Sequence, residues 1–120
     1  MNKNAMKYQS HLFLRGDKEE TVEVNEGMFR QNLGYDDTIF MARVSFRAGA
    51  EGYVHAHPHS QVTYVESGVF DFTIGDETQR LVAGDGTYIP PEADHGAICI
   101  EEGVLIDVFS PIREDFLPDN

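Results

Sequence analysis

Three histidines and one glutamine are spaced so that together they can ligate a metal ion. His55 and His57 lie two residues apart in a segment of strand character, so their imidazoles project from the same face. Pro58 has no N–H to donate to a strand ladder, so the chain resumes on a neighbouring strand, from which Gln61 can face the two histidines. His95 follows much later, as expected when a closed sheet brings distant strands together. Three imidazole nitrogens and one amide oxygen suit one divalent transition metal ion, and Ni, Zn, Fe, Mn and Co all fit.

Other residues of the same chemical types have simpler readings. His59 follows Pro58 in the turn, where we expect it to be exposed, and His11 has no partner pattern, which favours a structural role. Cys99 is in register with His95 on a regular strand, but a free cysteine is usually a small buried hydrophobe.

The elements that must position these residues are short strands. Turn signals rich in Gly, Asp and Asn recur every eight to twelve residues, and short apolar or alternating runs lie between them, a pattern typical of an all-β sandwich or barrel. The expected strands are 10–14, 28–33, 39–46, 53–57, 61–66, 69–74, 78–82, 87–89, 95–100 and 104–109. One helical turn is expected at Arg113–Leu117, where Pro118 stops it.

Length, composition and charge limit the function classes. A chain of 120 residues, 41% hydrophobic and 25% charged, fits a single folded domain, which we place at residues 21–120 behind an N-terminal arm at residues 1–20. The net charge of −12 opposes binding to nucleic acid or to an anionic membrane surface. The sequence contains no apolar run long enough to cross a bilayer and no signal segment, so we expect a cytoplasmic location. Apolar residues on both faces of the C-terminal strand pair predict a homodimer that covers the outer face.

Two groups of residues resemble the two cupin signatures. The first is Gly49, His55, His57, Gln61 and Gly68, which meets every interval of its signature. The second is Gly84, Pro90 and His95, although Glu92 and Cys99 stand where that signature has glycine and asparagine. The resemblance implies a double-stranded β-helix, a jelly-roll barrel with the metal in its lumen.

A closer resemblance, from about Val22 to Leu117, is to the pectin-degradation cupins of the KdgF type, and it rests above all on the stretch Asp107–Phe116. It implies that Asp107, Phe109 and Arg113 accompany the metal and that the substrate is a small anionic sugar acid. Such enzymes convert 4,5-unsaturated monouronates, released by polysaccharide lyases, to a linear ketonised form. Asp107 would then move a proton as general acid or base, Arg113 would clamp the carboxylate, and Phe109 would line the sugar ring.

Alternatives stay open at this point. Asp107 can instead be a rim or salt-bridged carboxylate, and Arg113 can simply pair with Glu114 or Asp115. A different metal-dependent cupin enzyme, such as a dioxygenase or small-acid lyase with iron on the same four residues, is the second hypothesis. Glutamate in place of Gln61 would have favoured it. A non-catalytic cupin that binds a small molecule is the third.

Overall fold

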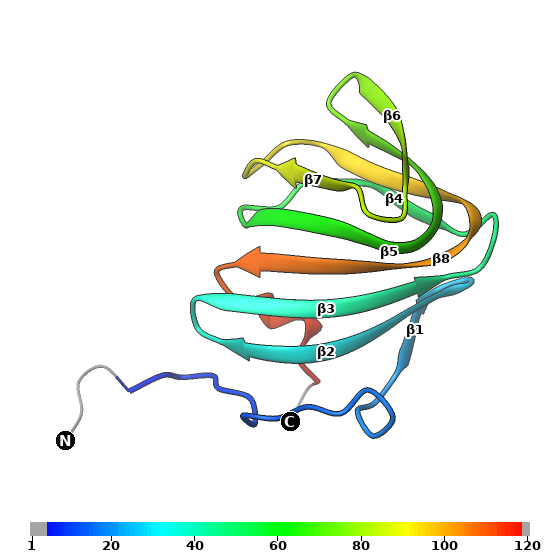
Figure 1. Ribbon diagram of the computed structural model, residues 1–120. Coiled ribbons are helices and arrows are strands. Elements are labelled where there is room, and N and C mark those ends of the chain that lie inside the picture. The colour runs from blue at the N-terminus through cyan, green and yellow to red at the C-terminus, as the bar shows by residue number, and fades with distance from the viewer. Residues whose placement is uncertain (1–4, 119–120) are drawn as a thin grey trace.

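An antiparallel β-sheet curls on itself and forms the body of the molecule (Figure 1). The computed structural model describes residues 5–118. Over these residues the strands are β1 (Val22–Asn25), β2 (Met28–Asp36), β3 (Ile39–Phe46), β4 (Glu51–His55), β5 (Ser60–Ile74), β6 (Glu77–Val82), β7 (Gly86–Ile89) and β8 (His95–Ser110), followed by a 3-10 helix η1 (Glu114–Phe116). The strand order is β1-β2-β3-β8-β5-β6, with β4 paired to β8 and β7 paired to β5.

The two longest strands, β5 and β8, are neighbours within this sheet. They pair along most of their lengths, from Ser60 opposite Ser110 to Ile74 opposite His95. We expected two shorter strands in each, separated by turns at Gly68 and Gly103, and that expectation is wrong. A Cβ atom on Gly68 would lie 2.6 Å from the Cα atom of Gly103. The two glycines therefore allow the backbones of β5 and β8 to approach closely at a bulge, so neither strand ends there.

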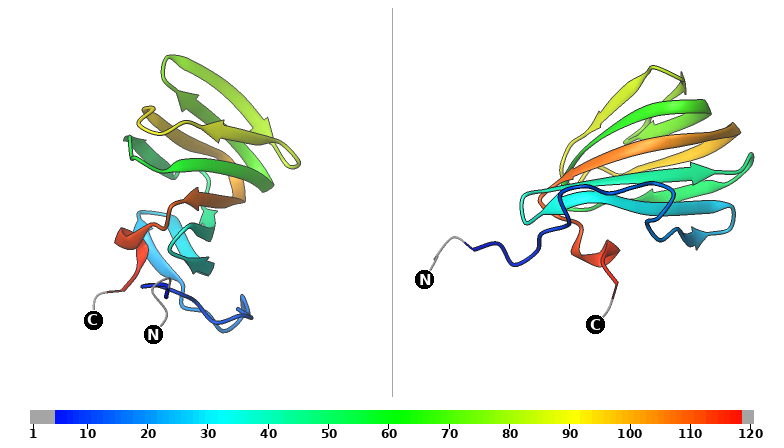
Figure 2. Two further views of the ribbon diagram at one scale, coloured as in Figure 1. Left: turned by 90° about the vertical axis from the view of Figure 1, so that its left-hand side faces the viewer. Right: turned by 60° about the horizontal axis from the view of Figure 1, so that its bottom comes forward.

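The N-terminal segment and the segment that follows β8 both pass beside β2 (Figure 2), which they contact through Asp36 and Asn32. The expected strand at residues 10–14 is absent from the described part of the chain, where Gln9 forms only an isolated bridge with Asp36. The hydrophobic residues Leu12 and Phe13 of this segment are exposed, so their apolar character does not reflect a buried strand. We did not predict β1, whereas the helical turn expected near residue 114 is present as η1. The boundary of the arm at residue 20 stays a prediction.

The hydrophobic core lies inside the curled sheet. Alternation along β5 buries Phe70 and Phe72 and turns Asp71 outward to pair with Arg80. The largest fully buried side chains are Phe40, Phe70, Ile89, Val65 and Cys99. The core therefore occupies part of the lumen and leaves the rest for the polar residues described below.

The outer face of the sheet keeps several large apolar side chains exposed. Val62, Tyr64 and Tyr88 lie on the paired strands β5 and β7, and Ile98 and Ile100 lie on β8. The homodimer that would cover such a face stays a prediction. No helix in the described range 5–118 is long and apolar enough to cross a membrane.

Candidate metal centre

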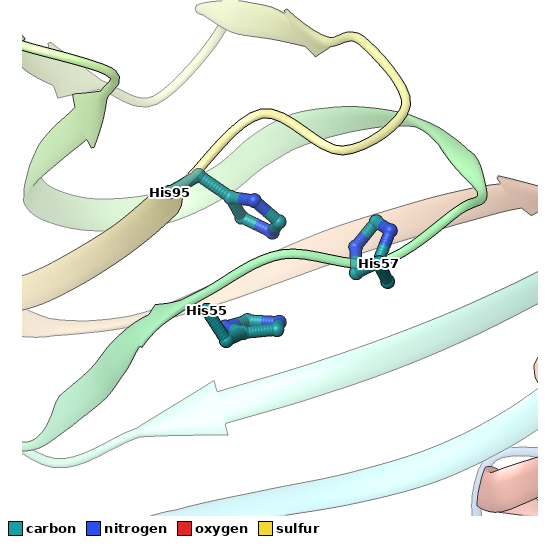
Figure 3. A group of neighbouring side chains, drawn as sticks. All are labelled: His55, His57 and His95. Carbon is teal, nitrogen blue, oxygen red and sulfur yellow. The ribbon is translucent and has the colours of Figure 1, made fainter.

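The three predicted histidines meet at one place in the lumen. His55 ends β4, His95 begins β8, and the two are register partners. β4 ends before His57, so this residue lies in the following segment and not in the strand where we expected it. One ring nitrogen from each histidine lies within 4.8 Å of the others, and Figure 3 shows the three rings gathered together. His57 and His95 are buried, whereas His55 is exposed.

Hydrogen bonds to backbone carbonyls orient all three rings in the same way. The Nδ1 atoms of His55, His57 and His95 donate to the carbonyl oxygens of Tyr53, His59 and Ala93, at 2.8, 3.2 and 2.9 Å. Because a carbonyl oxygen can only accept, each Nδ1 carries a proton, and in the neutral imidazole Nε2 then keeps its lone pair. Metal-binding histidines are oriented by bonds of this kind, so these three are prepared as neutral Nε2 ligands.

Gln61 completes the set that the sequence predicted. Its Oε1 atom lies 2.9 Å from Nε2 of His57. It reaches this position from β5, which pairs with β7 and β8, so our expectation that the glutamine lies on a strand next to β4 is wrong. Two acceptor atoms therefore face each other with no proton between them, an arrangement that a cation would stabilise. Two ligands bound side by side on one ion are about 3 Å apart when each bond is about 2.1 Å.

Burial keeps two of the imidazoles neutral. It lowers the pKa of both His57 and His95, and the charge of Arg113 acts in the same direction, whereas the contacts with Gln61 and Ala93 oppose the effect. A neutral imidazole is the form that binds a metal, so burial favours metal binding at these nitrogens. The donor set as a whole therefore fits a divalent transition metal ion held by His55, His57, Gln61 and His95.

The turn before His95 has the conformation expected of the cupin signature, although one of its residues differs. Glu92 stands where the signature has glycine, yet its φ of 68° is the left-handed conformation that glycine favours. Its N–H donates to the carbonyl of His57 at 2.8 Å. This bond ties the turn before His95 to the segment that carries His57.

A relay of hydrogen bonds joins Gln61 to Asp107. Nε2 of Gln61 donates to Oγ1 of Thr63 at 3.0 Å, and Oγ1 of Thr63 donates to Oδ1 of Asp107 at 2.6 Å. Thr63 and Asp107 are register partners on β5 and β8, which explains why they meet. The relay also fixes the glutamine amide, because its NH₂ group points to Thr63 and leaves its oxygen directed at His57.

The environment of Asp107 favours its protonated form. Burial raises the pKa of Asp107 to about 6, although the hydrogen bond from Thr63 and the charge of Arg113 oppose the rise. A carboxyl group with such a pKa can both donate and accept a proton near neutral pH. Asp107 also lines the same cavity as His55, Gln61 and His95.

This cavity, of about 220 Å³, lies between the metal centre and the segment that follows β8. Phe109 lines it as the sequence predicted, and its ring centroid lies 5.7 Å from that of His57. Apolar side chains, among them Val44, Leu105 and Ile89, line much of the remainder. The site therefore combines an apolar wall with a few polar groups, as small-molecule sites do.

Arg113 reaches the cavity from the segment after β8, and it is buried. Its Nε and Nη2 atoms donate to the two carboxylate oxygens of Asp115 at 3.0 and 2.7 Å, so the pairing that we weighed as the alternative role is present. Its guanidinium also lies over the rings of Phe109 and Phe116. One edge of its fork is therefore already occupied.

Two polar residues of the site were missed by the sequence analysis. Thr63 follows Gln61 by two residues on one strand, so the same-face rule could have found it. Arg30 lines the cavity from β2, and its only local signal is that it shares a face with Met28, which also lines the cavity.

The remaining histidine and cysteine readings have mixed outcomes. His59, which we expected to be exposed, is half-buried, and its Nε2 atom donates to the carbonyl of Ile112 at 3.0 Å. That bond ties the turn after β4 to the segment after β8. Cys99 is a buried free thiol, so the prediction of a small buried hydrophobe is confirmed.

Known proteins have sequences similar to that of this chain. The family model described as the cupin domain matches residues 42–109, which include all three histidines. The pectin degradation protein KdgF of Dickeya dadantii is 39% identical over 103 residues, covering 84% of this chain and 94% of that protein.

Solved structures are similar over most of the chain. An RmlC-like cupin from Shewanella frigidimarina is 46% identical, with a TM-score of 0.89 over 91% of this chain and 98% of that chain. KdgF from Halomonas sp. is 32% identical, with a TM-score of 0.86 over 90% of this chain and all of that chain. These matches confirm the all-β, double-stranded β-helix fold.

Proposed function

The chain belongs to the cupin family, and from that premise we propose that it is a metal-dependent enzyme that converts 4,5-unsaturated monouronates to a linear ketonised form. The two similar proteins named KdgF, one of them a pectin degradation protein, support a role in the breakdown of pectin or a related uronate polymer. The observation that carries the proposal is the relay from the histidine cluster through Gln61 and Thr63 to Asp107.

The ligand set suits this reaction better than oxygen chemistry. A divalent ion held by His55, His57, Gln61 and His95 would act as a strong Lewis acid for substrate oxygens, because all four ligands are neutral and leave its charge undiminished. This is the reason to place isomerisation ahead of the dioxygenase and small-acid lyase alternatives.

The reaction needs one proton to move from oxygen to carbon. As the hydroxyl proton of the ring hemiacetal leaves, the bond between C1 and the ring oxygen breaks and its electron pair remains on that oxygen. Carbon C4 then gains a proton, and the C5–oxygen bond becomes a ketone, so no atom is gained or lost. Asp107 is the group that takes up and returns this proton, because it lines the cavity and its pKa of about 6 suits both roles.

The other predicted residues position the substrate. Phe109 provides an apolar wall for the sugar ring next to Asp107. Arg113 makes its end of the cavity positive and directs its remaining N–H groups to substrate oxygens, while Asp115 holds its guanidinium in place.

Loss of the conjugated enol ether absorbance of an unsaturated monouronate tests the proposal directly. Metal-loaded wild-type protein should accelerate the loss, and Asp107→Asn should reduce kcat by about 10²- to 10⁴-fold. Asp71→Asn is the matched control, because Asp71 is a β5 carboxylate that pairs with Arg80 on β6. Wild-type protein that leaves both galacturonate- and guluronate-derived substrates unchanged would refute the function. Oxygen consumption with iron would then support a dioxygenase, and binding without turnover would support a non-catalytic cupin.

A further inference from the structure

Two arginines line the cavity, and they differ in how their charge is balanced. Both Arg30 and Arg113 pack on Phe116, with their guanidinium carbons 3.8 and 4.0 Å from its ring centroid. Arg113 gives one edge of its fork to Asp115. Arg30 donates from Nη2 to the carbonyl of Phe116 at 3.3 Å, which leaves most of its five N–H donors for another partner.

Arg30 lacks a carboxylate partner in the described part of the chain. The arginine ion pairs there are Arg43–Glu66, Arg80–Asp71 and Arg113–Asp115. Arg30 is half-buried, and burial lowers its pKa even though the charge of Asp115 opposes the effect. A half-buried cation without a carboxylate partner is costly, which is unexpected in a chain with 21 acidic residues and only 9 basic ones. An anion in the cavity would offset that cost.

We propose that Arg30 is the residue that binds the carboxylate of the substrate, while Arg113, which gives one edge of its fork to Asp115, packs on Phe116 and contacts other oxygens of the substrate. The planar guanidinium of Arg30 suits a carboxylate, because two parallel N–H groups can bind both oxygens. Strand β2 gives Arg30 a fixed backbone, and Phe116 fixes its guanidinium plane. The inference rests on the proposed function for the identity of the substrate, but carboxylate binding itself needs no turnover.

Binding of a matched pair of sugars tests the role of Arg30 apart from the reaction. D-galacturonate and D-galactose differ only in the carboxylate, so the ratio of their dissociation constants measures carboxylate recognition. Metal-loaded wild-type protein should prefer galacturonate, and Arg30→Gln should reduce that preference by about tenfold or more. Arg80→Gln, which removes an exposed arginine paired with Asp71 on the β5–β6 hairpin, should leave the preference unchanged.

Arg30→Lys is a second variant, which tests the proposal even if Arg30→Gln does not fold. It keeps the charge but loses the bidentate fork, so its preference should fall between those of wild type and Arg30→Gln. A preference equal to wild type in Arg30→Gln overturns the proposal. If that variant does not fold, a wild-type preference in Arg30→Lys overturns it, and so does a wild-type protein that binds both sugars equally.

Kinetic and binding measurements together distinguish an error in the proposed reaction from an error in the proposed role of Arg30. If wild type and Arg30→Gln convert an unsaturated monouronate with the same KM, the role of Arg30 is wrong and the proposed function stands. If no protein converts it but Arg30→Gln loses its preference for galacturonate, the reaction is wrong and the carboxylate site stands.

Discussion

Nε2 of His57 and Oε1 of Gln61 lie 2.9 Å apart, although neither atom has a proton to give the other. Nδ1 of His57 donates a hydrogen bond to the carbonyl oxygen of His59, and the NH₂ group of Gln61 donates to Oγ1 of Thr63. Each partner is thus fixed by a bond on its far side. The pair is arranged to share a cation, which gives the metal centre a physical reason beyond the spacing of its residues.

Removing one histidine should abolish metal retention. His95→Ala removes the ligand that begins β8, so its metal content after dialysis, by elemental analysis, should fall close to zero. His11→Ala is the matched control because His11 is exposed and lies in the N-terminal segment. Chelation should lower the thermal unfolding temperature of wild type but not of His95→Ala, because an ion that binds only the folded state stabilises it. Equal metal in all three proteins would contradict the site.

Gln61→Glu should raise the pKa of His57 in the metal-free protein. Burial lowers that pKa in the wild type, whereas a carboxylate 2.9 Å from Nε2 would favour the imidazolium form. An NMR titration should show an increase of about one unit or more. Gln79→Glu, at an exposed site on β6, should leave the pKa of His57 as it is in wild type. A pKa that stays the same or falls in Gln61→Glu would mean that the two side chains do not face each other.

Thr63→Val should move the acidic limb of the pH–rate profile to higher pH. The hydroxyl of Thr63 lowers the pKa of Asp107, so its removal raises that pKa and a more alkaline solution is needed to ionise the carboxyl. Thr73→Val is the control, since Thr73 lies on the same strand but bonds to Thr78. The profile of kcat/KM against pH measures the shift, and a limb that moves to lower pH would exclude this role of Thr63.

Asp107→Asn should stabilise the metal-free protein above pH 6. Folding raises the pKa of Asp107 from 3.8 to about 6, so the stability given by the neutral carboxyl is complete below pH 3.8 and is lost as the pH rises to about 6. The shift corresponds to about 3 kcal/mol, and because Asp107 is half-buried and not fully enclosed, we expect a gain of about 1–2 kcal/mol. Urea unfolding at pH 8 should show this gain, and at pH 3.5 it should disappear. A gain that is the same at both pH values would show that the charge of Asp107 is not its cause.

Local sequence was enough to bring His55 and His57 together, whereas the approach of His95 required a closed sheet that pairs distant strands. His55 and His57 are close because of a two-residue spacing, which needs only extended chain. The same two-residue spacing, from Gln61, could have identified Thr63. Arg30 could not be identified in this way, because its proximity to Phe116 depends on how the C-terminal segment returns to β2. Its unpaired charge could be recognised only once that return was known.

The prediction of the lengths of β5 and β8 was wrong for a different reason. A glycine permits a turn, and it also permits two backbones to approach closely, and the local sequence does not distinguish these uses. Ser67-Gly68 and Glu102-Gly103 were interpreted as turns because each places a glycine after a polar residue. In the structure they face each other across β5 and β8, which is a relationship between segments 35 residues apart that no local pattern contains.

Gly103→Ala should therefore destabilise the fold at that crossing. A Cβ atom at this position would overlap the carbonyl oxygen of Ser67 and crowd the Cα atom of Gly68, and both obstacles are backbone that cannot rotate away. We expect a loss of at least about 2 kcal/mol in the free energy of unfolding by urea. Gly16→Ala is the matched control, because nothing lies within 4 Å of a Cβ atom added there. If both variants unfold at the same urea concentration, β5 and β8 do not meet as closely as the structure indicates. A selective loss in Gly103→Ala would instead show that the glycine serves the close approach of the two strands that hold Gln61, Thr63 and Asp107 in register.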